Sequence, residues 1–303
     1  MTQRIAAIDL GTNTARLLIA DRAFDGTMEQ RYLERTIVRL GGGFSRDTGL
    51  SVDAIQRTLD CLNQFARQIA AHQVDTVRAV ATCAVRDAAN GNSFVRQVHD
   101  ETGISLSVIS GDMEGTLTVA GVLYGLTHPA HAVLMFDVGG GSTEFTLAID
   151  GVPIFVISLP LGVVRLTEGQ VTPEAMTDKI ARELDCLLLA LNKSGISLSP
   201  KPLLVATAGT ATTLAAISLQ MAEYDYRLVN NHILSCEEVE RILAMLLPMS
   251  CSERLKVPGL EPGREDLIIA GSLITQSVMR RLGYDSLVVS DFGLLEGLVV
   301  TPS

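Results

Sequence analysis

Two short turns of the same type constrain the fold of this chain more than any other feature. An apolar run reaches Asp9, a glycine and small polar residues follow, and a second apolar run continues to Ala20. The same order returns at Asp137, 128 residues further on, between apolar runs that start at Val133 and end at Ile149. An apolar run on each side of a tight polar turn is typical of a β-hairpin. The repeat predicts an internal duplication in which a hairpin opens each half.

After its hairpin, the first half alternates strands and helices. A helix is expected to start at Ser51, because apolar residues recur after it at helical spacing: Ile55, Leu59, Leu62, Phe65 and Ile69. A second helix over residues 93–101 is stopped by Gly103, and a third is expected to start with Asp112 as its N-cap. A strand is expected before the first helix, at residues 32–40, and two more between the helices, at residues 76–82 and 104–110. This alternation is typical of an α/β domain.

The second half contains helices with clear start signals. Residues 172–174 combine a capping threonine, a proline at the first helical position and an acid in the first turn, and the helix is expected to run to Gly195. Ser235 is expected to open a second helix with a capping box. Between them, a strand over residues 203–207 precedes a short helix. With 303 residues, of which 47% are apolar, the chain is long enough for two domains.

The composition argues against several classes of function. The 24 basic and 34 acidic residues give a net charge of −10, which argues against nonspecific binding to duplex nucleic acid. The longest apolar runs are far shorter than the roughly 20 residues that a membrane-spanning helix requires. Residues 1–4 lack the start of a signal peptide, so we expect a cytoplasmic protein that contacts no membrane. The cysteines have neither zinc nor disulfide spacing and are expected to be reduced: Cys61, Cys83, Cys186, Cys236 and Cys251.

Asp9 and Asp137 each stand where an apolar strand ends and a glycine turn begins. Such a turn brings backbone N–H groups close to phosphate oxygens, and the aspartate holds a hydrated Mg²⁺ against the phosphates. One such turn is more often an ordinary hairpin, but two in the same register favour a phosphate clamp. The chain has no GxxxxGKS or GxxxxGKT motif, and the turn at Asp137 lacks the last glycine of GxGxxG. Neither a P-loop nor a Rossmann site is therefore expected.

Six strings of residues follow one another in a specific order along the chain. The two most specific are GGGSTE at residues 139–144 and LGVVRLTE at residues 161–168. The others are IDLGTNT at 8–14, SGDME at 110–114, GTATT at 209–213 and SDFGLLEG at 290–297. Together they resemble the exopolyphosphatase and guanosine pentaphosphate phosphohydrolase family, and the resemblance covers essentially the whole chain.

The resemblance implies an actin-like fold of the α/β class. In this fold, which sugar kinases and the Hsp70 ATPase share, two ribonuclease H-like lobes are duplicated and the active site lies in the cleft. The first lobe would comprise residues 1–126, with the C-terminal helix at about 293–303 packed back on it. The second lobe would comprise residues 127–292.

The resemblance also implies roles for individual residues. Glu114 matches the catalytic glutamate, Arg86 a phosphate-contacting arginine of the catalytic group, and Glu144 a metal- or water-positioning acid. Asp9 and Asp137 would bind the metal, Mg²⁺ or Mn²⁺. Three turns would bind phosphate, through Gly11, Thr12, Asn13 and Thr14, through Gly139, Gly140, Gly141, Ser142 and Thr143, and through Gly209 and Thr210.

The charged candidates have ordinary structural alternatives. Glu114 falls in the first turn of its helix, where the helix dipole favours an acid even without catalysis. Arg86 follows the strand at 76–82 and would otherwise form a surface salt bridge. Arg165 and Arg264 are weaker phosphate-binding candidates of the same type.

Three departures from the family pattern bear on substrate binding. Residues 113–116 read Met-Glu-Gly-Thr in place of Glu-Glu-Ala-Arg, and Leu295 stands where an arginine is usual. With two arginines fewer, the chain is expected to bind a long polyanion more weakly. The chain also stops near residue 303, before the HD-type domain of longer members, so we expect better activity on short polyphosphate than on long polyphosphate.

The sequence therefore predicts a metal-dependent hydrolase that removes the terminal phosphate from inorganic polyphosphate. An alternative within the same class is hydrolysis of guanosine pentaphosphate to the tetraphosphate, an activity of the stringent response. Two alternatives belong to other classes: a kinase of the same fold, with residues 209–213 as its adenosine site, and a nonhydrolysing, nucleotide-switched assembly protein. A homodimer is left open.

Overall fold

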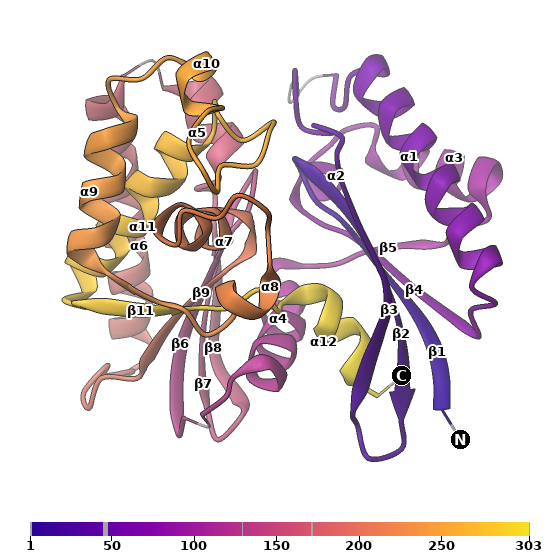
Figure 1. The fold of residues 1–303 in the computed structure, drawn as a ribbon, viewed down its shortest axis with the longest axis horizontal. Helices are drawn as coiled ribbons and strands as arrows, with labels where there is room; N and C mark the ends of the chain where they lie inside the picture. Colours follow the sequence, from indigo (N-terminus) through magenta and orange to yellow (C-terminus); the bar gives the residue numbers. More distant parts are fainter. Residues whose placement is uncertain (1, 45–47, 129, 171, 303) are drawn as a thin grey trace. The chain divides into compact units, whose positions relative to one another are not determined.

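The computed structural model describes residues 2–44, 48–128, 130–170 and 172–302. The chain divides into two compact units, each with its own mixed β-sheet (Figure 1). Unit 1 comprises Met1–Tyr124 and Gly293–Ser303, and unit 2 comprises Gly125–Phe292. No helix in the described part of the chain is long and apolar enough to span a bilayer.

Unit 1 is built on a five-stranded sheet with the order β3-β2-β1-β4-β5. Its strands are β1 (Thr2–Leu10), β2 (Thr14–Ala23), β3 (Met28–Ile37), β4 (Thr76–Ala81) and β5 (Leu106–Val108). Neighbouring strands are antiparallel from β3 to β1 and parallel from β1 to β5. The predicted hairpin and strands are confirmed, but β3 lies earlier than predicted. It ends at Ile37, two residues before the backbone of Arg39 takes a left-handed φ of 48°.

Helices cover both faces of the unit 1 sheet. Its helices are α1 (Val52–Ala71), α2 (Cys83–Arg86), α3 (Gly91–Thr102), α4 (Gly111–Gly125, whose last residue belongs to unit 2) and α12 (Leu294–Val300). Figure 1 shows α1 and α3 on the same side of the sheet. Phe65 of α1 and Phe94 of α3 belong to one core cluster. On the other face, α12 packs against Ile5 and Leu18. The predicted start of α1 is confirmed, since the Ser51 hydroxyl accepts the N–H of Ala54.

Glycines allow α4 and α12 to cross at very short distance within unit 1. A Cβ atom at Gly121 of α4 would lie 1.9 Å from the carbonyl oxygen of Gly293, which precedes α12. A Cβ atom at Gly297 of α12 would lie 1.9 Å from the carbonyl oxygen of Leu117. No side chain fits at either position, so the crossing requires glycine on both helices.

Unit 2 contains a six-stranded sheet with the order β10-β11-β9-β6-β7-β8. Its strands are β6 (Ala132–Val138), β7 (Thr143–Ile149), β8 (Val152–Leu159), β9 (Leu203–Thr207), β10 (Ile233–Ser235) and β11 (Ser286–Val289). β6, β7 and β8 form an antiparallel meander, and β9 lies parallel to β6. The hairpin and the strand predicted in this half are confirmed.

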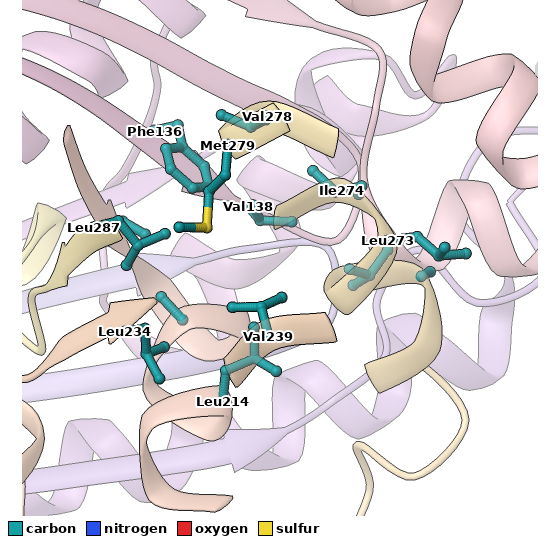
Figure 2. Packing of buried hydrophobic residues seen from close by; sticks show 14 of the residues in the cluster. Phe136, Val138, Leu214, Leu234, Val239, Leu273, Ile274, Val278, Met279 and Leu287 are labelled. Atoms are coloured by element: carbon teal, nitrogen blue, oxygen red, sulfur yellow. The ribbon is translucent and has the colours of Figure 1, made fainter. Parts of the chain in front are cut away.

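The helices of unit 2 enclose a large apolar core. They are α5 (Val163–Gly169), α6 (Pro173–Lys193), α7 (Ala208–Ser218), α8 (Tyr226–Val229), α9 (Cys236–Leu246), α10 (Cys251–Arg254) and α11 (Ile268–Leu282). Figure 2 shows Met279 of α11 among Phe136 of β6 and Leu287 of β11, all of which are fully or almost fully buried. This core fixes β6, and therefore the turn that follows it.

Two predictions about helix starts in unit 2 have different outcomes. The start of α6 is confirmed, because the Thr172 hydroxyl accepts the N–H of Ala175. Ser235 likewise caps α9 by accepting the N–H of Glu238. The reciprocal half of the predicted capping box is absent among the described contacts, because the Glu238 carboxylate pairs with Arg241 instead. A complete capping box forms at Ser250, where it was not predicted.

The two hairpins confirm the internal duplication. In unit 1, the N–H of Gly11 donates to the carbonyl of Thr14, and in unit 2 the N–H of Gly139 donates to the carbonyl of Ser142, both at 3.0 Å. The cross-strand register is also the same: Asp9 lies opposite Arg16, and Asp137 lies opposite Glu144. Arg16 and Glu144 are therefore equivalent positions that carry opposite charges.

Candidate functional site

In unit 1, three predicted site residues lie at or just after the carboxyl ends of three parallel strands. Asp9 lies near the end of β1, Arg86 ends the short helix after β4, and Glu114 lies in the helix after β5. Backbone hydrogen bonds link the ends of these strands. The N–H of Thr82 donates to the carbonyl of Leu10 at 3.2 Å, and the N–H of Ile109 donates to the carbonyl of Ala81 at 3.1 Å. Ligands of open α/β sheets bind at this edge.

Glu114 is a buried carboxylate in the first turn of α4, with 8% of its surface exposed. The prediction that Asp112 is the N-cap of this helix is wrong. Ser110 caps the helix instead, since its hydroxyl accepts the N–H of Met113 at 3.2 Å, and Asp112 falls inside the first turn. Glu114 still lies where the N-terminal end of the helix dipole favours its negative charge.

Arg86 lies beside Glu114 and also forms the surface ion pair that was its structural alternative, with Asp87. Its Nη1 is 3.7 Å from Oε2 of Glu114 and donates to the carbonyl of Ile109 at 3.0 Å. Its Nε is 3.7 Å from the Asp87 carboxylate. The guanidinium is thus anchored to the backbone after β5, with positive charge next to the candidate base.

The segment that follows β3 holds the first glycine turn through backbone hydrogen bonds. The carbonyl of Asn13 accepts the N–H groups of Val38 and Arg39 at 3.0 and 2.8 Å, and the carbonyl of Thr12 accepts that of Gly41 at 2.8 Å. The Asn13 side chain is 7% exposed, and its Oδ1 has no hydrogen-bond partner among the described residues. A buried acceptor of this kind calls for a ligand that donates a hydrogen bond or carries positive charge.

Asp9 is paired with an arginine that the sequence analysis did not single out. Nε and Nη2 of Arg16 lie 3.0 and 2.5 Å from Oδ2 of Asp9. Oδ1 receives no hydrogen bond from the residues that the structure describes. The carboxylate therefore has one oxygen bound to a cation of the protein and one oxygen available to water or metal.

The second glycine turn brings two buried carboxylates together in unit 2. Asp137 and Glu144 are register partners on β6 and β7, with 8% and 1% of their surfaces exposed. The hydroxyl of Ser158 donates to Oε1 of Glu144 at 2.6 Å. The turn is held by the first residues of α5, where the N–H of Val163 donates to the carbonyl of Gly139 and the N–H of Val164 to the carbonyl of Gly140, at 3.0 and 2.9 Å.

The third predicted phosphate turn begins α7, directly after β9. Ala208 has a left-handed φ of 65°, which is unusual for a residue with a side chain. A Cβ atom at Gly209 would lie 2.0 Å from Nη1 of Arg264, so the guanidinium packs directly on this glycine. Thr210 is buried behind it. Both weaker arginine candidates therefore lie at predicted phosphate turns. Arg264 lies at the third turn, and the backbone N–H of Arg165 donates to the carbonyl of Gly140 in the second turn.

The two carboxylates of the second glycine turn are of the type that a divalent cation binds. Among residues 2–44, 48–128, 130–170 and 172–302, no group of three or more His, Cys, Asp or Glu side chains forms a closed metal site. Mg²⁺ usually takes only one or two carboxylates and keeps waters or phosphate oxygens. Asp137 and Glu144, which lie opposite each other on β6 and β7, supply two carboxylates.

Known proteins of one family match this chain over most of its length. The model of the Ppx/GppA phosphatase family matches residues 20–302. Exopolyphosphatase 2 of Mycobacterium tuberculosis is 32% identical over 98% of both chains. A bifunctional 3-dehydroquinate synthase/phosphatase of Fusobacterium nucleatum is 31% identical over 97% of this chain, which spans 46% of that longer protein.

The solved structures extend the agreement to the fold. The structure of the PPX-GPPA enzyme of Aquifex aeolicus matches with a TM-score of 0.81 and 32% identity, and the match covers 100% of each chain. The predicted α/β, actin-like fold and the predicted hydrolase class are confirmed by these matches. The chain belongs to the Ppx/GppA phosphatase family.

Proposed function

We propose that this phosphatase releases terminal orthophosphate from inorganic polyphosphate by attack of water. The observation that carries the proposal is the buried Glu114 carboxylate, 3.7 Å from the Arg86 guanidinium, at the edge of the unit 1 sheet where the first glycine turn begins. A carboxylate can accept a proton from water, and an arginine next to it can bind a phosphate oxygen. Full-length relatives named exopolyphosphatase support the choice of substrate.

Glu114 is the proposed general base. As the oxygen of water bonds to the terminal phosphorus, its proton passes to the Glu114 carboxylate, and the bridging P–O bond breaks with its electron pair on the remaining chain. Arg86 contributes positive charge for the phosphoryl oxygens, on which negative charge spreads during the reaction. Its hydrogen bond to the carbonyl of Ile109 restricts the guanidinium to this side of the site.

The glycine turns are the proposed phosphate-binding elements. Gly11 and Gly139 let their turns close tightly, since a Cβ atom there would lie 3.3 and 3.2 Å from the carbonyl oxygens of Thr14 and Ser142. Gly209 leaves room for the guanidinium of Arg264, which can bind a phosphate oxygen. The backbone contacts from residues 38–41 and 163–164 fix the first two turns before substrate arrives. Such preorganisation reduces the entropy that binding must remove.

Asp137 and Glu144 are the residues that we propose hold Mg²⁺ or Mn²⁺. When bound, the cation supplies charge neutralisation to the phosphoryl oxygens. Ser158 orients Glu144 through its hydrogen bond. In unit 1, Asp9 remains the other aspartate predicted to bind a metal, and Arg16 offsets part of its charge. The cytoplasmic location stays a prediction of the sequence.

The test is orthophosphate release from tripolyphosphate, long-chain polyphosphate and guanosine pentaphosphate, measured side by side with and without Mg²⁺. The proposal expects metal-dependent release from the inorganic chains without an acceptor alcohol. Release from guanosine pentaphosphate alone would assign the alternative substrate. No release from any of the three, or transfer only to an added acceptor, would overturn the hydrolase proposal.

A further inference from the structure

The segment that follows β3 contains one residue in a strained backbone conformation. Arg39 has a left-handed φ of 48°, which a residue with a side chain rarely adopts. Such strain persists only where the surrounding structure holds the backbone in place, and it is most common at functional sites. The N–H of Arg39 donates to the carbonyl of Asn13 at 2.8 Å, and its carbonyl accepts the N–H of Gly42 at 3.0 Å. The strained residue is therefore bonded directly to the first glycine turn.

An arginine of α1 binds the same segment through two backbone carbonyls. Nε of Arg57 donates to the carbonyl of Val38 at 3.2 Å, and its Nη2 donates to the carbonyl of Arg39 at 3.4 Å. The N–H groups of these two residues donate to the carbonyl of Asn13 at 3.0 and 2.8 Å. Val38 and Arg39 thus connect the Arg57 guanidinium to the first glycine turn, because each has its carbonyl bonded to one and its N–H bonded to the other.

The middle of the first glycine turn depends on these backbone contacts. The carbonyl of Thr12 accepts the N–H of Gly41 at 2.8 Å, and a Cβ atom at Gly41 would lie 2.2 Å from Cγ2 of Thr12, so the segment also packs directly on the turn. Oδ1 of Asn13 has no hydrogen-bond partner among the described residues, so this buried atom does not hold the turn. The hydrogen bonds from residues 38–41 therefore set the position in which the Asn13 side chain meets a ligand.

We propose that Arg57 is a positioning residue for the first phosphate-binding turn. It acts through the backbone of Val38 and Arg39, whose N–H groups fix the carbonyl of Asn13. The inference rests on the proposed function, in which this turn binds phosphate, and it adds a residue that lies outside every predicted motif. A turn that is fixed before substrate arrives loses less entropy on binding, so Arg57 should contribute to substrate affinity and not to the chemical step.

The first test compares Arg57→Gln with Arg67→Gln, which removes the same charge from another exposed position of α1. Arg57→Gln should raise KM for tripolyphosphate about three- to tenfold and leave kcat nearly unchanged, whereas Arg67→Gln should change neither. Arg57→Lys keeps the charge but not the planar fork that reaches both carbonyls, so its KM should resemble that of Arg57→Gln. Equal KM values for the two glutamine variants, or a wild-type KM in Arg57→Lys, would overturn the inference.

A second test uses the backbone strain at Arg39. Glycine adopts a φ of 48° without strain, so in Arg39→Gly the segment should keep its conformation even when Arg57 is replaced. Arg57→Gln should therefore raise KM less in the Arg39→Gly background than in the Arg39→Ala background, where alanine keeps the strain. Both backgrounds lack the Arg39 side chain, so the loss of its own contacts is the same in each. An equal increase of KM in the two backgrounds would contradict the inference.

Hydrogen exchange tests the same contacts without turnover. The amides of Val38 and Arg39 should exchange about three- to tenfold faster in Arg57→Gln than in the wild type, and at the wild-type rate in Arg67→Gln. Unchanged exchange in Arg57→Gln would show that the guanidinium does not hold the segment, and the inference would fail. If the wild type releases no phosphate from tripolyphosphate, the proposed function fails instead, and the exchange rates alone decide whether Arg57 positions the turn.

Discussion

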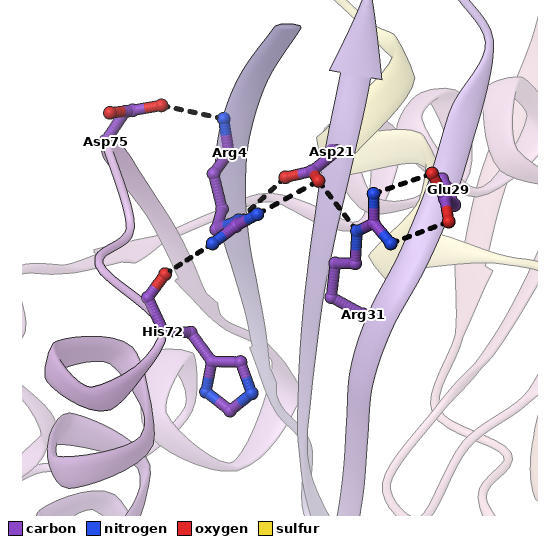
Figure 3. Close-up of polar contacts among 6 residues, drawn as sticks. All are labelled: Arg4, Asp21, Glu29, Arg31, His72 and Asp75. Atoms are coloured by element: carbon purple, nitrogen blue, oxygen red, sulfur yellow. Dashed lines mark hydrogen bonds and ion pairs between the residues drawn. The ribbon is translucent and has the colours of Figure 1, made fainter.

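A buried aspartate far along the sheet from the catalytic residues makes the stability of unit 1 depend on acid pH. Figure 3 shows Asp21 of β2 between Arg4 of β1 and Arg31 of β3. Nε of Arg4 is 2.7 Å from Oδ1 of Asp21, and Nε of Arg31 is 2.7 Å from Oδ2. The backbone N–H of Arg4 also donates to Asp75, and its Nη1 donates to the carbonyl of His72. The network joins three strands to the loop after α1.

The hydrogen bond from Arg4, with a smaller contribution from Arg31, lowers the pKa of Asp21 from 3.8 to about 2, although burial opposes the shift. This difference corresponds to about 2 kcal/mol of folding free energy once the carboxyl is ionised. The side chains of Arg4 and Arg31 are 35% and 41% exposed, so solvent screening lowers our expectation to about 1 to 2 kcal/mol. Because the folded-state pKa is depressed, the contribution is complete above about pH 5 and is lost as the pH falls from about 4 through 2.

The assay is urea unfolding of Asp21→Asn and the wild type, followed by circular dichroism because the chain has no tryptophan. At pH 7 the substitution should lower the free energy of unfolding by about 1 to 2 kcal/mol. At pH 3 the difference should be about half as large, because part of the wild-type contribution is already lost. Asp100→Asn, at an exposed position of α3, is the matched control and should change stability little at either pH.

A difference that is the same at pH 7 and pH 3 would refute the electrostatic explanation. Asp21 would then stabilise unit 1 through shape and neutral hydrogen bonds alone. A difference that grows towards low pH would show that the sign of the pKa shift is wrong.

Three other substitutions, one of them a control, test local features of unit 2. Ala208→Gly should raise the free energy of unfolding by about 0.5 to 1 kcal/mol, since glycine adopts the φ of 65° without strain. The control Ala211→Gly, inside the same helix, should lower it. Thermal unfolding measures both changes in stability, and changes of the same sign would contradict this explanation. Asp137→Ala should reduce kcat more than substrate affinity, because the cation acts on charge that develops in the transition state. An unchanged Mg²⁺ dependence of kcat in that variant would argue against Asp137 as a ligand.

Local signals predicted most of the secondary structure because each has a physical cause within a few residues. The hydroxyls of Ser51 and Thr172 satisfy the first backbone N–H groups of α1 and α6, and the sequence shows both. α11 was missed. Its first seven residues, Ile268–Ile274, are all buried, so they show no apolar stripe, and no side chain caps its start at Leu267.

The candidate site was predictable in its residue types but not in its pairings. The repeated Asp and Gly of the two turns identified the hairpins at Asp9 and Asp137. Asp9 lies opposite Arg16, and Asp137 lies opposite Glu144. These pairings depend on the register of the two strands, which the spacing of residues along the sequence does not give. The N-cap at Ser110 was missed for a similar reason, because Asp112 is an equally good capping residue and only the backbone geometry distinguishes them.

The most direct test of the proposed mechanism is the turnover of Glu114→Gln on inorganic polyphosphate. Glutamine keeps the size of the side chain but cannot accept the proton of water, so kcat should fall by about 10² to 10⁴ while substrate affinity changes little. Asp112→Asn is the matched control, an exposed acid in the same first turn of α4, and should retain nearly full turnover. A folded Glu114→Gln protein that keeps more than about a tenth of wild-type kcat, well above the range for a lost general base, would contradict the account.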